Sequence, residues 1–463
     1  MKKSKLTLFI FLSFILGILA GYLLNIKWIN KYNERILAAE SQTKVIQAKM
    51  LATNDTTHIQ YSLLKKELVK QTTIRRENSS IREKKLEILS LLSDIFLRLI
   101  KMIVGPLIFT TLVAGIAKVG DIKAVGRIGA KTMLWFISAS LLSLILGAIL
   151  VNLFKPGIAM HLPLPDSRVS SGIQSGALSL KDFISHMFPK SFIEAMANNE
   201  ILQIVIFSIF FGVATAAIGE KGALVIKAMD AFSHVILKIT SYIMNFAPLA
   251  VFGAIAAIIA KQGLSVLSTY AVFVSEFYLG ILILWLVLIF IGFIILNKRV
   301  FKLIIELKEA ILVAFSTASS EAAYPKTMLQ LERFGCKDKI VSFVLPLGYS
   351  FNLDGSMMYM TFASLFIAQS YGVHISVEQQ LIMLLILMLT SKGVAGVPRA
   401  SLVVIAGTIT TFNIPEAGIA LLLGVDPILD MGRSATNVIG NSIATAVVSK
   451  WEGELTPPII NEN

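Results

Sequence analysis

The last apolar block of the chain carries polar side chains at helical spacing. Asp430 and Ser434 lie four residues apart, and so do Arg433 and Asn437, and Asn437 and Asn441. Side chains three or four positions apart share one face of an α-helix, so this spacing predicts a continuous polar stripe. Asp430 can hold an ammonium group, and Arg433 can bind a carboxylate through two hydrogen bonds. A ligand with both charges, such as an acidic amino acid, fits this pair.

One carboxylate of the same block has a simpler interpretation. Asp426 lies four residues before Asp430. A charge at the centre of a bilayer costs at least about 2.5–3.5 kcal/mol on insertion scales, so it must face a partner or a cavity. For Asp426, a purely structural pair with an arginine is therefore as good an interpretation as contact with a ligand. For the whole stripe, this structural interpretation is poor, because an ion pair that holds two helices together needs no additional Ser and Asn.

A second polar constellation interrupts the apolar run 345–367. It reads Asn352-Leu353-Asp354-Gly355-Ser356 and combines an amide, a carboxylate, a glycine and a hydroxyl. The constellation predicts a local break in a helix and an oxygen-lined site; the alternative is a simple kink, tolerated by the glycine, with a neutral, buried Asp354.

Two further apolar segments are interrupted by polar or small residues. Residues 310–328 are broken by a Ser- and Thr-rich run at 316–320, and residues 381–411 by 391–398, which contains Lys392, two glycines and Pro398. Irregular backbone at membrane depth must be buried in protein or line a watery cavity, and paired interruptions indicate a transporter binding site. The flanking arms are too short to span a bilayer, which favours re-entrant hairpins over ordinary loops.

The composition places these motifs in a membrane. Of 463 residues, 55% are hydrophobic and only 15% are charged, whereas soluble domains are about 25% charged. The net charge of +13 lies mostly between apolar blocks, where cytoplasmic loops and lipid headgroups account for it, so we expect lipid contacts and no nucleic-acid partner. A single cysteine, Cys336, excludes an intrachain disulfide framework.

The N-terminal region predicts the orientation of the chain. Three lysines precede the uncharged run 6–24, which is longer than the apolar core of a signal peptide and close to the roughly 20 residues of a membrane span. We expect an uncleaved first helix in the cell (inner) membrane with a cytoplasmic N-terminus. The polar segment that follows has 13 Lys/Arg and 7 Asp/Glu between residues 27 and 87 and no Gly or Pro between 26 and 85. It predicts a helical insertion outside the cytoplasm, either a helical hairpin or a short coiled coil.

Taken together, the motifs at 316–325, 352–356, 391–398 and 426–441 resemble those of the dicarboxylate/amino acid:cation symporter family, over roughly residues 89–455. The resemblance implies an all-α polytopic membrane protein with eight transmembrane helices and two re-entrant helical hairpins, assembled as a homotrimer with an elevator mechanism. The expected parts are a first helix (1–25), the insertion (26–88), scaffold helices (89–130 and 155–262), a transport domain (131–154 and 263–455) with hairpins near 300–330 and 376–411, and a tail (456–463).

The resemblance also assigns site residues, position by position. The implied substrate contacts are Ser319, Ser320, Ser356, Val397, Asp430, Arg433, Ser434 and Asn437. The implied cation ligands, several through backbone carbonyls, are Gly348, Ser350, Asn352, Asp354, Ser391, Lys392, Val394, Asn437 and Asn441. No organic cofactor is implied; Na⁺ is the expected coupling ion, and H⁺ remains open.

Several positions depart from the family pattern. Asn441 stands where some members carry a sodium-binding aspartate, and Met360 where some carry a protonatable glutamate. Arg399 adds charge to the tip of the second hairpin, and the hydroxyl expected from the third helix falls to Ser138 or Ser140. Coupling to sodium, to protons or to both therefore stays open.

Competing functions differ in what they require of these residues. The nearest is uptake of C4-dicarboxylates on the same scaffold, but Asp430 would repel a dianion. An intramembrane hydrolase using Ser319 or Ser320 lacks a base beside the nucleophile, because all five histidines lie outside the motifs. A channel predicts charged rings rather than a constellation of ligand size. We therefore expect a symporter of L-glutamate or L-aspartate and not an enzyme.

Overall fold

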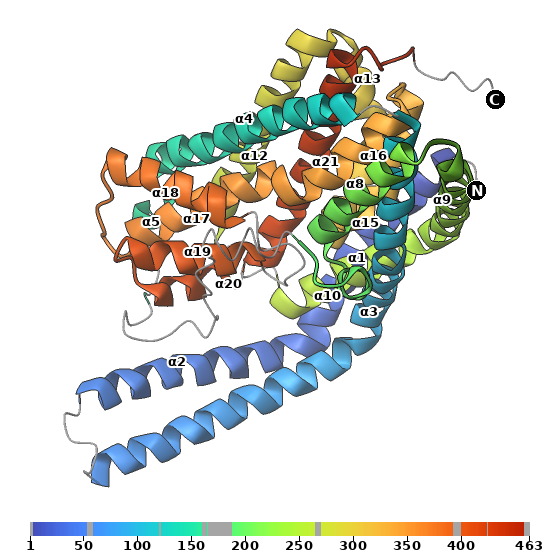
Figure 1. Cartoon of the computed structure of the whole chain (residues 1–463). Helices are drawn as coiled ribbons and strands as arrows, with labels where there is room; N and C mark the ends of the chain where they lie inside the picture. The colour runs from blue at the N-terminus through green and yellow to red at the C-terminus, as the bar shows by residue number, and fades with distance from the viewer. Residues whose placement is uncertain are drawn as a thin grey trace.

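The computed structural model describes residues 3–52, 59–119, 122–159, 164, 188–263, 270–391, 400–423 and 425–457, and this part contains helices and one isolated β-bridge but no strand (Figure 1). The α-helices are α1 (Lys3–Leu24), α2 (Asn30–Ala52), α3 (Ile59–Val119), α4 (Ile122–Phe154), α5 (Pro156–Ala159), α7 (Phe192–Ala197), α8 (Ile201–Ala217), α9 (Ala223–Ile243), α10 (Ala247–Gln262), α12 (Ala271–Leu296), α13 (Arg299–Glu306), α14 (Lys308–Thr317), α15 (Ser320–Phe334), α16 (Asp338–Phe351), α17 (Asp354–Ser370), α18 (Val377–Thr390), α19 (Ala400–Thr411), α20 (Ala420–Leu423) and α21 (Asp426–Trp451).

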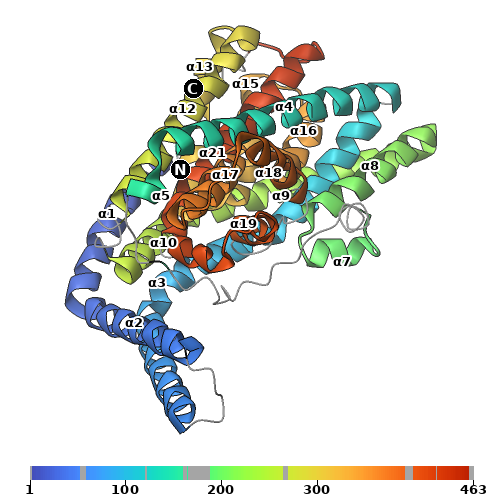
Figure 2. The ribbon, with the colours of Figure 1, turned by 90° about the vertical axis from the view of Figure 1, so that its left-hand side faces the viewer.

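The N-terminal helices are unusually long. A π-helical turn at Asn25–Ile29 joins α1 to α2 without a break, and α3 continues for 61 residues, or about 90 Å. Outside the bundle, α2 and α3 lie side by side and project away from the other helices in both views (Figures 1 and 2). Arg75 of α3 pairs with Glu40 of α2 at 2.9 Å. Helix α3 continues through residue 88, where the expected insertion ends, and residues 59–104 contain no Gly or Pro.

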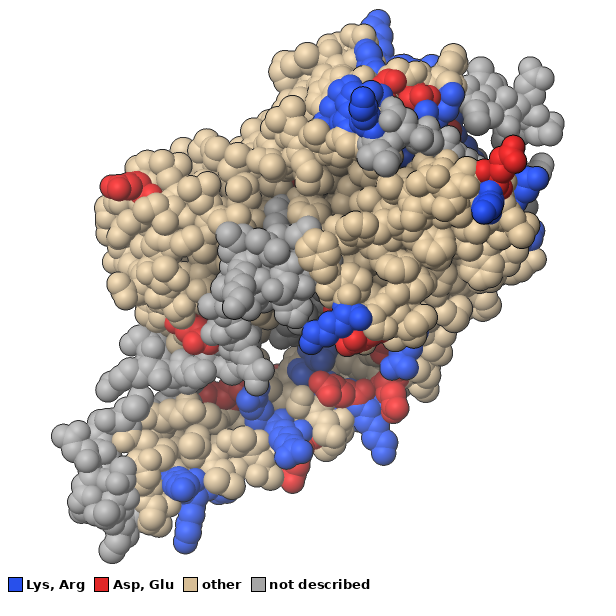
Figure 3. Space-filling view, in the orientation of Figure 1, with Lys and Arg blue, Asp and Glu red and all other residues tan. Residues whose placement is uncertain are grey.

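Five helical stretches of the described residues are long and apolar enough to cross a membrane: Leu8–Gln47, Gln60–Ala117, Lys123–Ala159, Gly219–Lys261 and Ala271–Leu296. Charged side chains gather at opposite ends of the molecule, and a surface almost free of charge lies between them (Figure 3). The helices α14, α15, α18 and α19 have only 10, 15, 14 and 12 residues. At 1.5 Å per residue, none of these four reaches across a hydrocarbon core of about 30 Å.

Helix α21 forms the centre of one group of helices. It packs against α4, α12, α14, α15, α16 and α17, and nearly all of its residues from Leu429 to Ser449 are buried. Trp285 of α12 donates a hydrogen bond from Nε1 to Oγ1 of Thr436 at 2.8 Å, which fixes the rotation of α21 against α12. A second group consists of α1, α3, α8, α9 and α10, and α3 contacts the first group through α15 and α16. The polar stripe therefore lies inside protein rather than against lipid.

The helix that carries the second polar constellation is broken in the middle. Helix α16 ends at Phe351 and α17 begins at Asp354, so that Asn352 and Leu353 form a short non-helical link. The link exposes backbone groups that an unbroken helix would pair internally, which requires partners in the surrounding protein. This break agrees with the one expected from the sequence at these residues.

Candidate functional site

Arg433 stands at the centre of an ion-pair network near the start of α21. Its Nη2 lies 3.1 Å from Oδ1 of Asp426 and 2.9 Å from Oδ1 of Asp430. The guanidinium lies over the ring of Tyr359 on α17, 4.0 Å from the ring centre, where cation–π attraction holds it. The hydroxyl of Tyr359 donates to Asp426 at 3.0 Å. Two helices thus fix the arginine in one orientation.

The two carboxylates differ in exposure. The side chain of Asp430 is 38% exposed, whereas those of Asp426 and Arg433 are each 3% exposed. Within the described residues, Nε and Nη1 of Arg433 are buried and have no hydrogen-bond partner. Asp430 is therefore the carboxylate that a ligand can reach, and Arg433 keeps two donors for a ligand. Asp426 fits the structural interpretation, a pair with an arginine, because its Oδ1 accepts hydrogen bonds from both Arg433 and Tyr359.

The polar stripe continues to a contact between α21 and α17. The amide oxygen of Asn437 accepts a hydrogen bond from the backbone N–H of Gly355 at 3.0 Å, and its Nδ2 donates to Oγ of Ser356 at 3.3 Å. Asn437 thus satisfies an N–H group in the first turn of α17, which has no partner within its own helix. Ser434, buried and one turn before Asn437, completes this part of the stripe.

The two serines assigned to the first hairpin lie at its tip. Ala318, in the left-handed conformation (φ 49°), ends α14, and Ser319 caps α15 by accepting a hydrogen bond from the backbone N–H of Ala322 at 3.3 Å. Ser320 is half-buried in the first turn of α15. A buried ion pair between Glu309 of α14 and Lys326 of α15 links the two arms. Both arms pack on α21, which carries the stripe.

The break between α16 and α17 faces the C-terminal half of α21. Nδ2 of Asn352 donates to Oδ2 of Asp354 at 3.0 Å and to Oδ1 of Asn441 at 3.1 Å. A Cβ on Gly440 would lie 1.9 Å from Oδ2 of Asp354, and one on Gly348 would lie 2.3 Å from Oδ1 of Asn441. Glycine at both positions lets the three helices come together around these oxygens.

These oxygens fit a hard monovalent cation. Asn352 and Asp354 are fully buried, and Oδ1 of Asn352 has no hydrogen-bond partner among the described residues. An unpaired buried amide oxygen is costly unless something positive meets it. The described residues hold no group of three His, Cys, Asp or Glu that could bind a metal ion of the zinc type. One carboxylate with amide and hydroxyl oxygens is the donor set that Na⁺ accepts.

Helix α4, which contains Ser138 and Ser140, supplies two hydroxyls to this region. Oγ of Ser143 donates to Oδ1 of Asp354 at 3.3 Å, and Oγ of Ser140 donates to the carbonyl of Phe351 at 3.3 Å. Of the two candidates named from the sequence, Ser140 lies at the site, whereas Ser138 is exposed and bonds only to its own helix. Ser143 was missed, although its i+3 spacing from Ser140 places both hydroxyls on one face.

The remaining assigned residues are only partly described. Lys392, Val394 and Val397 lie outside the described residues, as does Arg399. Ser391 is buried at the end of α18, and its hydroxyl donates to the carbonyl of Met388 at 3.0 Å. Ser350 is buried, with no partner for its hydroxyl in the described part of the chain, and the carbonyl of Gly348 accepts the N–H of Asn352.

Comparison with known proteins identifies the family to which the chain belongs. The model of the sodium:dicarboxylate symporter family matches residues 6–451. A C4-dicarboxylate transport protein of Bacillus subtilis is 42% identical over 372 residues, covering 78% of this chain and 87% of that protein. A proton/sodium-glutamate symport protein of Bacillus caldotenax is 41% identical over 373 residues, with the same coverage. A C4-dicarboxylate transport protein of Laribacter hongkongensis is 41% identical over 375 residues, covering 79% of this chain and 84% of that protein.

The chain belongs to the sodium:dicarboxylate symporter family. Its family and its relatives are transporters rather than enzymes, and the names of the family and of the Bacillus caldotenax protein include a coupling cation. Because relatives with two different substrate names match equally well, identity alone does not select the substrate. The choice between these two substrates has to rest on the side chains at the site.

Proposed function

We propose that this protein takes up an acidic amino acid, L-glutamate or L-aspartate, together with Na⁺, H⁺ or both. The observation that carries the proposal is the pairing of the exposed carboxylate of Asp430 with Arg433, which has two unpartnered donors. An amino acid that brings an ammonium to Asp430 and a carboxylate to Arg433 leaves neither side chain unpaired. Charge-assisted hydrogen bonds of this kind are about twice as strong as neutral ones.

A C4-dicarboxylate is the second candidate, because two of the relatives named above carry that substrate in their names. Arg433 with Asp426 and Asp430 has a net charge of −1. A dianion bound at the free donors of Arg433 would add negative charge beside Asp426 and Asp430, with no ammonium group to offset the repulsion. The site as built therefore disfavours a dianion.

The finer architecture of the proposal rests on helix lengths and on the family. We propose eight transmembrane helices, with α14–α15 and α18–α19 as re-entrant hairpins, since these four helices are too short to span. The first helix (1–25) would start in the cytoplasm and carry the insertion (26–88) outside. A homotrimer with a fixed scaffold (89–130 and 155–262) and a moving transport domain (131–154 and 263–455) would carry the substrate across the membrane.

The test is uptake by the full-length protein in proteoliposomes. Labelled L-aspartate, L-glutamate and succinate are offered under a sodium gradient alone and under a proton gradient alone. We expect uptake of an acidic amino acid that is driven by sodium and is not competed by succinate. Uptake driven only by protons would reassign the coupling ion. Succinate uptake without amino-acid uptake would contradict the role given to Asp430.

A further inference from the structure

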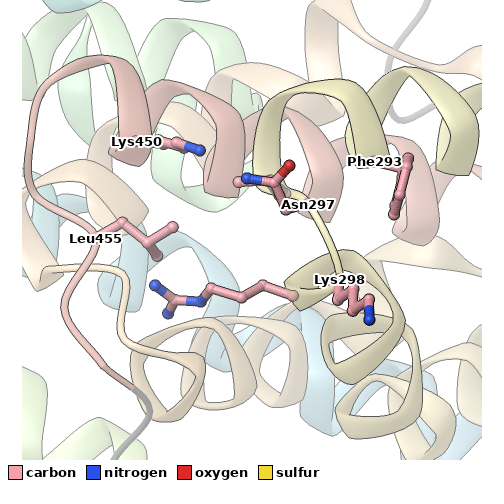
Figure 4. A pocket seen from close by; sticks show the side chains of 7 residues that line it. Phe293, Asn297, Lys298, Lys450 and Leu455 are labelled. Atoms are coloured by element: carbon pink, nitrogen blue, oxygen red, sulfur yellow. The ribbon is translucent and has the colours of Figure 1, made fainter.

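A basic cavity lies where α12 is followed by α13, at the opposite end of α21 from Asp430 and Arg433. It has a volume of about 520 Å³ and is lined by Asn297, Lys298 and Arg299 at the helix junction and by Lys450 in the last turn of α21. Figure 4 shows Lys450 and Asn297 pointing toward one another across the opening, with Lys298 on another side. None of the lining residues is acidic.

The three cations of this cavity lack carboxylate partners. Within the described residues, none of Lys298, Arg299 and Lys450 takes part in a salt bridge. The two carboxylates that follow α21 are both committed elsewhere: Glu452 pairs with residues of α4, and Glu454 pairs with lysines at the start of α16. In the described part of the chain, no carboxylate balances the positive charge of the cavity, and Lys450 donates a hydrogen bond to the carbonyl of Ile295.

Arg299 is fixed in place rather than mobile in solvent. Its Nη2 donates to the carbonyls of Phe334 at 3.1 Å and Thr456 at 2.7 Å, and its guanidinium lies 5.0 Å from the ring centre of Phe334. Its Nε is buried and has no partner among the described residues. A guanidinium held by two carbonyls with a spare buried donor is preorganised to receive an anionic oxygen.

The position of the cavity relative to the membrane indicates which kind of anion it would bind. The 26 residues of α12 span about 39 Å and carry one charge, Glu276 near the start; the next charges follow the helix end, at the level of lipid headgroups. An exposed apolar stripe of α12, with members at Leu286, Phe290 and Phe293, leads to the cavity. On the other side, α13 exposes Phe301 and Ile305. Aromatic and basic side chains together on a short amphipathic helix are typical of a membrane interface.

We propose that this cavity binds the phosphate headgroup of an anionic phospholipid, whose acyl chains lie along the exposed stripe of α12. Basic cavities between membrane helices are known to accept such headgroups. Free inorganic phosphate shares the headgroup chemistry, but it would gain nothing from the apolar stripe. The proposal does not depend on which substrate the polar stripe binds.

The test measures lipid binding to the full-length protein in a neutral detergent by native mass spectrometry, with phosphatidylglycerol and phosphatidylcholine titrated separately. We expect phosphatidylglycerol to bind at least about five-fold more tightly, the order of magnitude for one basic side chain near an anionic headgroup. Lys298→Glu should abolish this preference. The matched control is Lys302→Glu, since Lys302 is an exposed lysine of α13 that does not line the cavity.

Two outcomes would overturn the proposal. If millimolar inorganic phosphate displaces phosphatidylglycerol from the wild type, the cavity is a site for free anions. If Lys302→Glu reduces the preference as much as Lys298→Glu, the attraction is diffuse and the cavity is not a site. Should Lys298→Glu fail to fold, Lys298→Ser and Lys450→Gln each remove one of the three cations of the cavity, and a preserved preference in both variants would also exclude the site.

Discussion

At the scale of single residues, Asp426 and Asp430 bind the same arginine and yet have different roles. Asp426 is buried and bonded by both Arg433 and Tyr359, whereas Asp430 is partly exposed. We expect Asp430→Asn to raise the half-saturating L-aspartate concentration about 10- to 100-fold, the effect of losing one charged hydrogen bond of about 1.5–3 kcal/mol. Uptake measured over a range of L-aspartate concentrations checks this. A normal half-saturation in the variant would mean that Asp430 does not meet the ammonium.

The matched variant Asp426→Asn should have a different effect. It weakens a buried pair inside the protein, so we expect a loss of about 1.5–3 kcal/mol in folding free energy and a lower melting temperature in detergent. The melting temperature of Asp430→Asn should stay close to that of the wild type. If both variants melt alike, the difference in exposure between the two carboxylates does not reflect a difference in role.

Asn441 is the residue at which cation affinity can be tuned. Its Oδ1 accepts a hydrogen bond from Asn352, and Asn352 also bonds Asp354. Asn441→Asp adds a second carboxylate to the proposed cation site, and we expect the half-saturating Na⁺ concentration for uptake to fall about ten-fold, because oxygen sites bind cations more tightly as their charge increases. Sodium titration of uptake at constant pH checks this. An unchanged sodium dependence would place the coupling cation elsewhere.

At the scale of elements, the close approach of α17 and α21 depends on Gly440. A Cβ there would meet Oδ2 of Asp354 at 1.9 Å, so Gly440→Ala must displace either the carboxylate or the helix. We expect this variant to lose at least about ten-fold in uptake, because a displacement of about 1 Å at a bound group is enough for such losses. Gly407→Ala on α19, where a Cβ would have nothing within 4 Å, is the control and should leave uptake unchanged. Full uptake by Gly440→Ala would show that Asp354 can move without consequence.

The elements also show what the sequence predicts and what it does not. The break at Asn352 and the stripe on α21 follow from local composition and spacing, and both are present. The cation–π contact of Arg433 and the hydrogen bond to Asp426 do not follow, because both are made by Tyr359, which is brought in by the packing of α17 on α21. The spacing of Ser143 from Ser140 places both on one face of α4, but the hydrogen bond from Ser143 to Asp354, 211 residues away in sequence, does not follow from that helix alone. The site is fixed by contacts between helices that are far apart in the sequence, and such contacts cannot be predicted from one helix alone.

At the scale of the whole molecule, the segment after α21 ties the C-terminus to two other helices. Burial alone would raise the pKa of Glu452, but hydrogen bonds from Arg127 and Lys131 outweigh it and lower the pKa. A hydrogen bond from Lys339 lowers the pKa of Glu454. Groups whose pKa is lower in the folded state stabilise the fold at neutral pH, and this contribution is lost as the pH falls through their folded pKa values.

We therefore expect the contribution of these two glutamates to the melting temperature of the purified protein to persist from pH 7 down to the ordinary pKa of glutamate, about 4.3, and to be lost as the pH falls further. Glu454→Gln should lower the value at pH 7 and make the pH dependence shallower. The control is Glu378→Gln at an exposed position of α18. If the melting temperature changes equally with pH in the wild type and in Glu454→Gln, the ion pairs of Glu454 contribute nothing to stability.

The continuity of α3 has a mechanical consequence. Helix α3 runs without interruption from the outer α2–α3 pair into the bundle and bends on the way (Figures 1 and 2), and α2 packs along its outer part. The 23 residues of α2 give this outer part a length of about 35 Å, so a tilt of about 5° at its base would move the outer end by roughly 3 Å. A spin label at the exposed position Leu63, paired with one at the exposed position Leu286 of α12, would report such a tilt relative to the membrane part.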